Sequence, residues 1–357
     1  MTCKQMCIFL VVMTAGGVLH AAPATQPLTP EQAVYRSNVA LVETLMTEPS
    51  DDELLHLGRH YRSRGDFPRA TTLHLAALRG KADVPGFEYE LACDFALWGH
   101  AKLGMSYLQR AADHGYWGYP VIADDTDVDA LKKDPAFPAA MAKIKANFSV
   151  ESLKHAPDIT LKTPTGKAPV AGWPVVVFLH GWGSSRHDFD DDAAFVATLG
   201  YVGITLDAND VMGPGAYTWG NDTVDPTNKR IQAALKGLKV AVDSKRIYLQ
   251  GFSQGAMHAA RLLADHPDLY GGAICNSPGP LSLVPPKLSD PGHTGTIVLS
   301  LGSHEHPDTA KGVNTIFALW NTATRPAHLI RFEGGHQLPP DRDSMYRTAL
   351  EQISGGK

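Results

Sequence analysis

From residue 158 onward, strand-like and helix-like patterns of hydrophobic residues alternate along the chain. Short apolar runs, such as 174–179 and 272–276, are typical of strands that are covered on both faces. This alternation predicts a mostly parallel sheet with helices on both faces, in which an active site lies at the carboxyl ends of the strands. The predicted strands are 158–162, 174–179, 201–206, 246–250, 272–276, 296–301 and 327–332, and the predicted helices are 190–199, 226–242, 254–266, 311–321 and 341–353.

Residues 31–145 have helical spacing and an internal repeat. Residues 57–77 align with 91–111 at a shift of 34, with small and large residues at matching positions. Each unit predicts two helices joined by a turn. The pattern resembles the tetratricopeptide repeat, whose period is 34 residues, and 126–137 resembles the tail that caps such arrays. The module is expected either to bind a peptide or protein partner or to pack on the domain that follows.

The N-terminal segment predicts a secretory signal peptide. Lys4 is followed by the apolar run 6–19 and by small residues at 21, 22 and 24. A bilayer span needs about 20 residues, so this run is short for one. An uncleaved anchor or a buried helix is the alternative. We therefore expect an exported protein with three parts, a signal peptide at 1–24, an all-α tetratricopeptide-like domain at 25–150 and an α/β domain at 151–357.

Composition narrows the functional classes. Hydrophobic residues make up 44% and charged residues 19%, which excludes a disordered chain. The net charge of −5 and the lack of a long basic run argue against nucleic-acid binding. No later segment is apolar for long enough to cross a membrane. Cleavage of the signal removes Cys3 and Cys7, and we expect Cys93 and Cys275 to be buried free thiols.

The predicted strand 246–250 runs into Gly251-Phe252-Ser253-Gln254-Gly255 and then into a predicted helix. A serine between glycines on a strand-to-helix turn is the nucleophile elbow of many hydrolases. The motif also occurs by chance, so the correct flanking elements are what favour it here. Ser253 is the candidate nucleophile. The N–H of Gln254 is a candidate donor to the oxyanion that forms during attack.

A serine nucleophile needs a base and an acid. His336 follows the last predicted strand and lies after Ser253, as the order Ser, acid, His requires. The acid should follow strand 296–301, where Glu305 and Asp308 both qualify. We favour Glu305, with Asp308 as the alternative and Glu333 as a third candidate.

The loop His180-Gly-Trp-Gly183 follows an early strand and predicts a second oxyanion donor. We expect the N–H of Trp182 to be that donor, with Gly183 as the alternative. Segment 207–222 is rich in Gly and Asn and contains Tyr217 and Trp219. These two aromatic residues could line the substrate pocket, or the segment could be a packed surface loop.

Together, the motifs at 180–183, 251–255, 302–308 and 335–336 resemble the α/β-hydrolase superfamily, with phospholipase/carboxylesterase and dienelactone-hydrolase-like esterases as the nearest relatives. The resemblance implies hydrolysis of an ester substrate by a serine nucleophile, without a metal or cofactor. The chain differs from the family at Glu305, where Asp is usual. Ser253 stands where dienelactone hydrolases themselves use Cys, which argues against that activity.

Two other functions remain open from the sequence. The same residues could cleave amides in a serine peptidase. The hydrolase domain could also be inactive, with the helical repeats acting as a binding protein.

Overall fold

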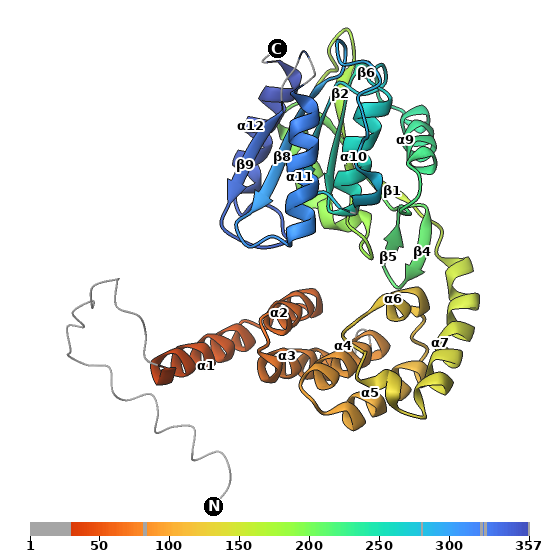
Figure 1. Cartoon of the computed structure of the whole chain (residues 1–357), viewed down its shortest axis with the longest axis vertical. Helices are drawn as coiled ribbons and strands as arrows, with labels where there is room; N and C mark the ends of the chain where they lie inside the picture. The colour runs from red at the N-terminus through yellow and green to blue at the C-terminus, as the bar shows by residue number, and fades with distance from the viewer. Residues whose placement is uncertain (1–29, 81–83, 280, 322–323, 325–326, 356–357) are drawn as a thin grey trace, which may run out of the picture. The chain divides into compact units, whose positions relative to one another are not determined.

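The computed structural model describes residues 30–80, 84–279, 281–321, 324 and 327–355. The predicted signal peptide, Cys3 and Cys7 lie outside the described residues. The chain divides into two compact units, one up to Leu73 and one from His74; Figure 1 shows their elements in chain order. The domain boundary expected near residue 150 lies inside the second unit and stays a prediction.

The first unit consists of helices. It contains α1 (Pro30–Met46), α2 (Asp51–Ser63) and the first half of α3 (Phe67–Gly80), which crosses the division between the units. A capping box begins α2, because Ser50 N–H donates to Glu53 Oε2 at 2.8 Å and Glu53 N–H donates to Ser50 Oγ at 3.3 Å. The predicted turn between α2 and α3 is confirmed.

The second unit begins with more helices, namely α4 (Val84–Leu97), α5 (Ala101–Asp113), α6 (Tyr119–Asp124) and α7 (Phe137–Glu151). They enclose a hydrophobic core of their own. Helices α4 and α5 cross closely at Gly104, where a Cβ atom would lie 2.9 Å from the Ala92 carbonyl oxygen. The helical prediction is confirmed, although α6 was not foreseen. The tetratricopeptide assignment stays a prediction.

A seven-stranded sheet forms the rest of the second unit. Its order is β1-β3-β2-β6-β7-β8-β9, and every neighbouring pair is parallel except β1 and β3. This confirms the predicted mostly parallel sheet. The strands are β1 (Ile159–Lys162), β2 (Trp173–Leu179), β3 (Val202–Leu206), β6 (Val242–Phe252), β7 (Gly272–Asn276), β8 (Thr296–Gly302) and β9 (His328–Phe332).

Helices cover both faces of this sheet (Figure 1). Val175 and Val177 point into a core shared with α9, α10 and α11. Val176 and Phe178 point to the other face, into a core shared with α8 and α12. The continuous apolar runs seen in the sequence follow from this double burial. The helices are α8 (Asp190–Thr198), α9 (Asp225–Gly237), α10 (Gln254–Asp265), α11 (Pro307–Trp320) and α12 (Arg342–Ser354).

Three elements differ from the sequence prediction. Helix α9 ends at Gly237 rather than at 242, because Leu238 is extended and the apolar residues that follow it pack against the core at alternate positions. Helix α11 begins at Pro307 rather than at 311. Segment 207–222 contains an unpredicted hairpin of β4 (Asp210–Gly213) and β5 (Ala216–Thr218).

The hairpin lies against the helices of the same unit. A Cβ atom at Gly213 would lie 2.8 Å from the Cα of Gly118, the residue that precedes α6. The absence of a side chain at Gly213 therefore allows the two backbones to approach. Within the described ranges, every helix is too short or too polar to span a bilayer.

We expect Gly255→Ala to destabilise the fold strongly. A Cβ atom there would lie 2.5 Å from the His180 carbonyl oxygen, so α10 and β2 would have to move apart. Such overpacking typically costs about 1–3 kcal/mol of unfolding free energy, measurable by urea titration. Gly237→Ala is the control, because nothing lies within 4 Å of its Cβ position and alanine favours a helix by up to about 1 kcal/mol. Equal stability of the two variants would contradict this packing.

Candidate active site

Ser253 lies on the turn between β6 and α10, at the carboxyl edge of the sheet. Its backbone has φ 52° and ψ −116°, a conformation that costs a non-glycine residue about 1–3 kcal/mol. The last residue of β7 and the segment that follows it hold this turn from both sides. Ser253 N–H donates to the Asn276 carbonyl at 2.9 Å, and Gly279 N–H donates to the Ser253 carbonyl at 3.1 Å. The strained turn keeps the serine side chain out of the elements on either side.

A hydrogen-bonded chain runs from this serine to a buried carboxylate. His336 Nε2 lies 2.9 Å from Ser253 Oγ, and His336 Nδ1 lies 2.9 Å from Glu305 Oε1. Because a carboxylate only accepts, Nδ1 carries the proton and Nε2 is left to accept from the hydroxyl. The Glu305 side chain is 1% exposed and that of His336 is 40% exposed. The chain therefore leads from a buried charge to the half-buried Ser253 hydroxyl.

Pairing between two loops brings Glu305 to His336. Ser303 N–H donates to the Phe332 carbonyl at 2.9 Å, and His304 N–H donates to the Gly334 carbonyl at 2.8 Å. The loops that follow the neighbouring strands β8 and β9 thus run side by side. A Cβ atom at Gly302 would lie 2.5 Å from the Gly335 carbonyl oxygen, so the close approach requires a glycine there.

The other two acids considered from the sequence lie elsewhere. Asp308 is exposed in the first turn of α11, where its N–H donates to His306 Nδ1 at 3.3 Å. Glu333 is exposed and accepts a hydrogen bond from Ser303 Oγ at 2.7 Å. Of these three carboxylates, only Glu305 contacts His336.

Two backbone N–H groups beside Ser253 have no hydrogen-bond partner among the described residues, those of Trp182 and Gln254. Gln254 opens α10, whose N-terminus favours negative charge. A Cβ atom at Gly181 would lie 3.6 Å from Ser253 Cβ, so the loop that carries Trp182 runs next to the serine. The alternative donor, Gly183, is engaged, because its N–H donates to the Tyr217 carbonyl at 3.0 Å.

The side chain of Gln254 has a role that the sequence analysis missed. It is 2% exposed, and its amide is bonded to the segment after β5. Oε1 accepts from Trp219 N–H at 3.1 Å, while Nε2 donates to the Gly220 carbonyl at 3.2 Å and to Asn221 Oδ1 at 2.8 Å. In the sequence, the position of Gln254 in the first turn of the predicted helix was the only sign of this role.

The two aromatic residues of segment 207–222, for which a pocket role and a packed loop both stayed open, are buried. Trp219 is 1% exposed and Tyr217 is 7% exposed, and both belong to the core beneath the sheet. Trp219 Nε1 donates to the His180 carbonyl at 2.9 Å. The aromatic side chain that faces solvent near Ser253 is that of Trp182, which is 41% exposed.

One group of potential metal ligands lies in the helical part of the second unit. Ligand atoms of Cys93, Asp125 and Asp127 lie within 4.8 Å of one another. Asp125 Oδ2 already accepts from the Tyr89 hydroxyl and lies 3.8 Å from Cys93 Sγ. Cys93 and Cys275 are buried thiols that form no disulfide among the described residues, and burial raises the pKa of the Cys275 thiol.

Comparisons with known proteins point to esterases. No protein-family model matches the chain. Putative esterase NocK of Nocardia uniformis subsp. tsuyamanensis is 28% identical over 141 residues, which cover 36% of this chain and 40% of that protein. An esterase of Mycobacterium tuberculosis is 28% identical over 137 residues, 38% of this chain and 43% of that protein. The chain thus matches less than half the length of each of these curated relatives.

Among solved structures, a carboxylesterase of Bacillus cereus is similar to 55% of this chain and 94% of its own length. Its sequence is 18% identical, with a TM-score of 0.46.

His258 lies on α10 and supports the same segment as Gln254. Its Nε2 donates to the Gly220 carbonyl at 2.9 Å, and its Nδ1 accepts from the Thr227 hydroxyl at 2.9 Å. Burial lowers the pKa of His258 from 6.5 to about 4. Between these values the unfolded chain binds a proton that the folded chain does not, so stability falls as the pH falls from 6.5 to 4.

We expect His258→Gln to remove this part of the acid sensitivity. A shift from 6.5 to about 4 corresponds to roughly 3 kcal/mol of unfolding free energy. The stability difference between wild type and variant should narrow by about that amount between pH 7 and pH 4 in urea titrations. Burial of Asp192 raises its pKa to about 6, which makes an opposite contribution in the same range, but that contribution is common to both proteins and cancels in the difference. Parallel pH profiles would contradict the prediction.

Proposed function

We propose that this protein is an exported serine hydrolase that cleaves carboxylic esters through an acyl-enzyme. The observation that carries the proposal is the continuous hydrogen-bonded chain of Ser253, His336 and Glu305 at the carboxyl edge of the sheet. The named esterases among its relatives support the same reaction class. The fold and the order of these residues agree with a member of the α/β-hydrolase superfamily.

In the first half of the proposed reaction, Ser253 Oγ attacks the ester carbonyl carbon while His336 Nε2 takes its proton. Glu305 holds the Nδ1 proton and stabilises the imidazolium that results. The carbonyl oxygen becomes negatively charged and accepts hydrogen bonds from the N–H groups of Trp182 and Gln254. As the carbonyl re-forms, the alkoxide leaves with the proton from His336, and the acyl group stays on Ser253.

Water completes the cycle. His336, now neutral again, removes a proton from a water molecule, whose oxygen attacks the acyl carbon. The second tetrahedral intermediate uses the same two N–H donors. Its collapse releases the carboxylic acid and returns the proton to Ser253 Oγ. All atoms of this cycle come from the ester, water and the named residues.

Export is part of the proposal because of the apolar run at 6–19 and the small residues that follow it. The N-terminal sequence of the protein recovered from a periplasmic or extracellular fraction tests this part. A start between residues 22 and 25 is the expected result, and an intact Met1 in the cytoplasm would contradict it.

We expect Ser253→Ala to abolish both ester hydrolysis and labelling by a fluorophosphonate probe. Ser253 is half-buried, and its hydroxyl is hydrogen-bonded to His336. Its loss leaves no other internal polar group without a partner, so the variant should fold normally. Turnover of p-nitrophenyl esters and probe labelling measure the two effects. A folded variant that keeps the wild-type rate would exclude Ser253 as the nucleophile. Turnover of peptides but not of esters by the wild type would instead favour a peptidase.

We expect Glu305→Gln to lower kcat by orders of magnitude, because it removes the charge that fixes the tautomer of His336. The loss is on the order of 10⁴ when the acid of a serine-protease triad becomes its amide. Asp308→Asn is the matched control on the same loop-to-helix segment, and its exposed side chain should change kcat by no more than about threefold. The reverse ranking in steady-state kinetics would assign the acid to Asp308.

A further inference from the structure

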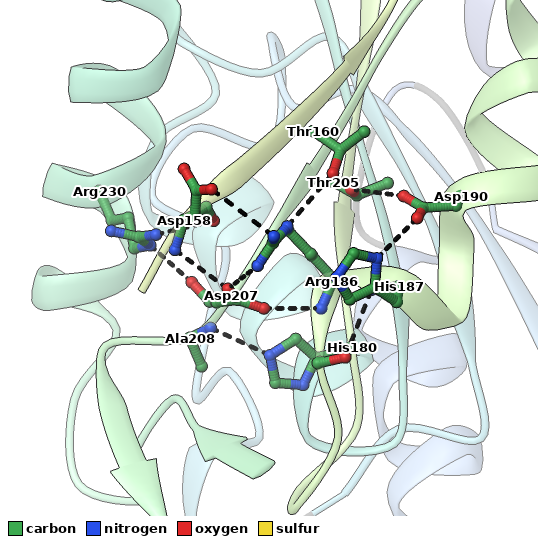
Figure 2. A network of polar contacts seen from close by, with 11 residues as sticks. Asp158, Thr160, His180, Arg186, His187, Asp190, Thr205, Asp207, Ala208 and Arg230 are labelled. Atoms are coloured by element: carbon green, nitrogen blue, oxygen red, sulfur yellow. Dashed lines mark hydrogen bonds and ion pairs between the residues drawn. The ribbon is translucent and has the colours of Figure 1, made fainter. Parts of the chain in front are cut away.

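We infer that Asp207 is a positioning residue, which holds the loop 180–186 so that the Trp182 N–H points at the reacting carbonyl. The catalytic consequence rests on the proposed function. Asp207 directly follows β3, and its side chain is 0% exposed. Figure 2 shows its contacts with Asp158, Arg186 and Arg230. A carboxylate this deeply buried is costly unless both of its oxygens are bonded. Its partners therefore indicate what it is there to hold.

Both oxygens of Asp207 are used. Oδ1 accepts from the backbone N–H of Arg186 at 2.9 Å. Oδ2 accepts from the Asp158 N–H at 3.0 Å and pairs with the Arg186 guanidinium. Arg186 thus meets one carboxylate with both its backbone and its side chain, which fixes the position and the direction of the end of the loop.

The start of the loop is bonded to Ala208, the residue that follows Asp207. Ala208 N–H donates to His180 Nε2 at 3.0 Å, so Nδ1 carries the proton and donates to the Gly181 carbonyl at 2.6 Å. Burial lowers the pKa of His180, which keeps this ring neutral. The two ends of the loop, His180 and Arg186, are therefore attached to two consecutive residues, 207 and 208.

Trp182 lies between these two attachment points. The middle of the loop is also bonded to the β4–β5 hairpin, because Gly183 N–H donates to the Tyr217 carbonyl at 3.0 Å and Tyr217 N–H donates to the Ser184 carbonyl at 2.9 Å. The attachment of the loop to residues 207 and 208 forms a clamp. Arg230 supports it, because its Nε donates to the Asp207 carbonyl at 2.5 Å and its Nη2 donates to the Asp158 carbonyl at 3.0 Å. A shift of the Asp207 carboxylate would move the Arg186 end of the loop while β2 stays in place. Trp182 N–H would then turn relative to Ser253.

The test compares two buried Asp–Arg pairs in the same domain. Asp207→Asn keeps the shape but turns an N–H donor toward the donors of Arg186 or Asp158. Asp192→Asn is the matched control, because Asp192 is 4% exposed and pairs with Arg342 Nη1 at 2.9 Å, between α8 and α12. Both variants are measured at pH 8 in the full chain, by steady-state ester hydrolysis, by inhibition with a trifluoromethyl ketone and by deuterium uptake of peptides that cover 180–186.

We expect Asp207→Asn to lower kcat by about 10- to 100-fold with KM changed less than about threefold, since losing an oxyanion donor outright costs about 10²–10³. The ketone forms a tetrahedral adduct, so its affinity should fall by the same factor as kcat/KM. Deuterium uptake in 180–186 should rise. Asp192→Asn should show none of these three changes, even if it lowers the melting temperature equally.

Wild-type kinetics with matching deuterium uptake in both variants would overturn the inference. If Asp207→Asn does not fold, Arg186→Lys decides. That variant keeps the charge but loses the guanidinium fork, so a 3- to 10-fold fall in kcat with faster uptake supports the clamp, and wild-type behaviour overturns it. If the wild-type protein hydrolyses no ester, the proposed function fails, and deuterium uptake alone judges whether Asp207 holds the loop.

Discussion

The contact of one helix backbone with one strand end determines most of the site. Gly255 lets the first turn of α10 approach the His180 carbonyl more closely than any side chain would allow. This contact places the helix N-terminus, the strained Ser253 turn and the loop after β2 within reach of one another. The serine, both candidate N–H donors and the buried amide of Gln254 all lie within a few residues of it. The sheet holds β2 and β6 side by side, and this fixes the positions from which the loop after β2 and α10 meet.

Local patterns predicted most of the second unit and the residues at the centre of the site. The double burial of the parallel strands appears in the sequence as continuous apolar runs. Ser253 and His336 could be found because a glycine-flanked turn and a fixed chain order are local signals. The choice between Glu305 and Asp308 stayed open, since it depends on where α11 begins and on the pairing of two loops that are 30 residues apart. Pro307 starts the helix early enough to keep Asp308 on the surface.

The features that escaped the sequence analysis are those that depend on distant partners. Strands β4 and β5 are four and three residues long, too short for alternation to be recognised. The sequence left open whether Trp219 lines the pocket or packs in a loop, and the bond from its indole N–H to the His180 carbonyl links segments that are 39 residues apart. No motif marks Asp207 or the side-chain amide of Gln254, and the contacts of both are with segments more than twenty residues away.

The close packing of Gly213 on the backbone of Gly118 has a consequence for how the chain can be divided. The hairpin receives the Gly183 N–H on one side and meets the residue before α6 on the other. At Gly213 the hairpin has no room for a Cβ atom, because the backbone of Gly118 lies against it. The helical segment 84–151 is thus a fitted support for the β4–β5 hairpin. If another helical module replaced it, the catalytic residues would stay unchanged, but the β4–β5 hairpin beside them would lose the surface against which it packs.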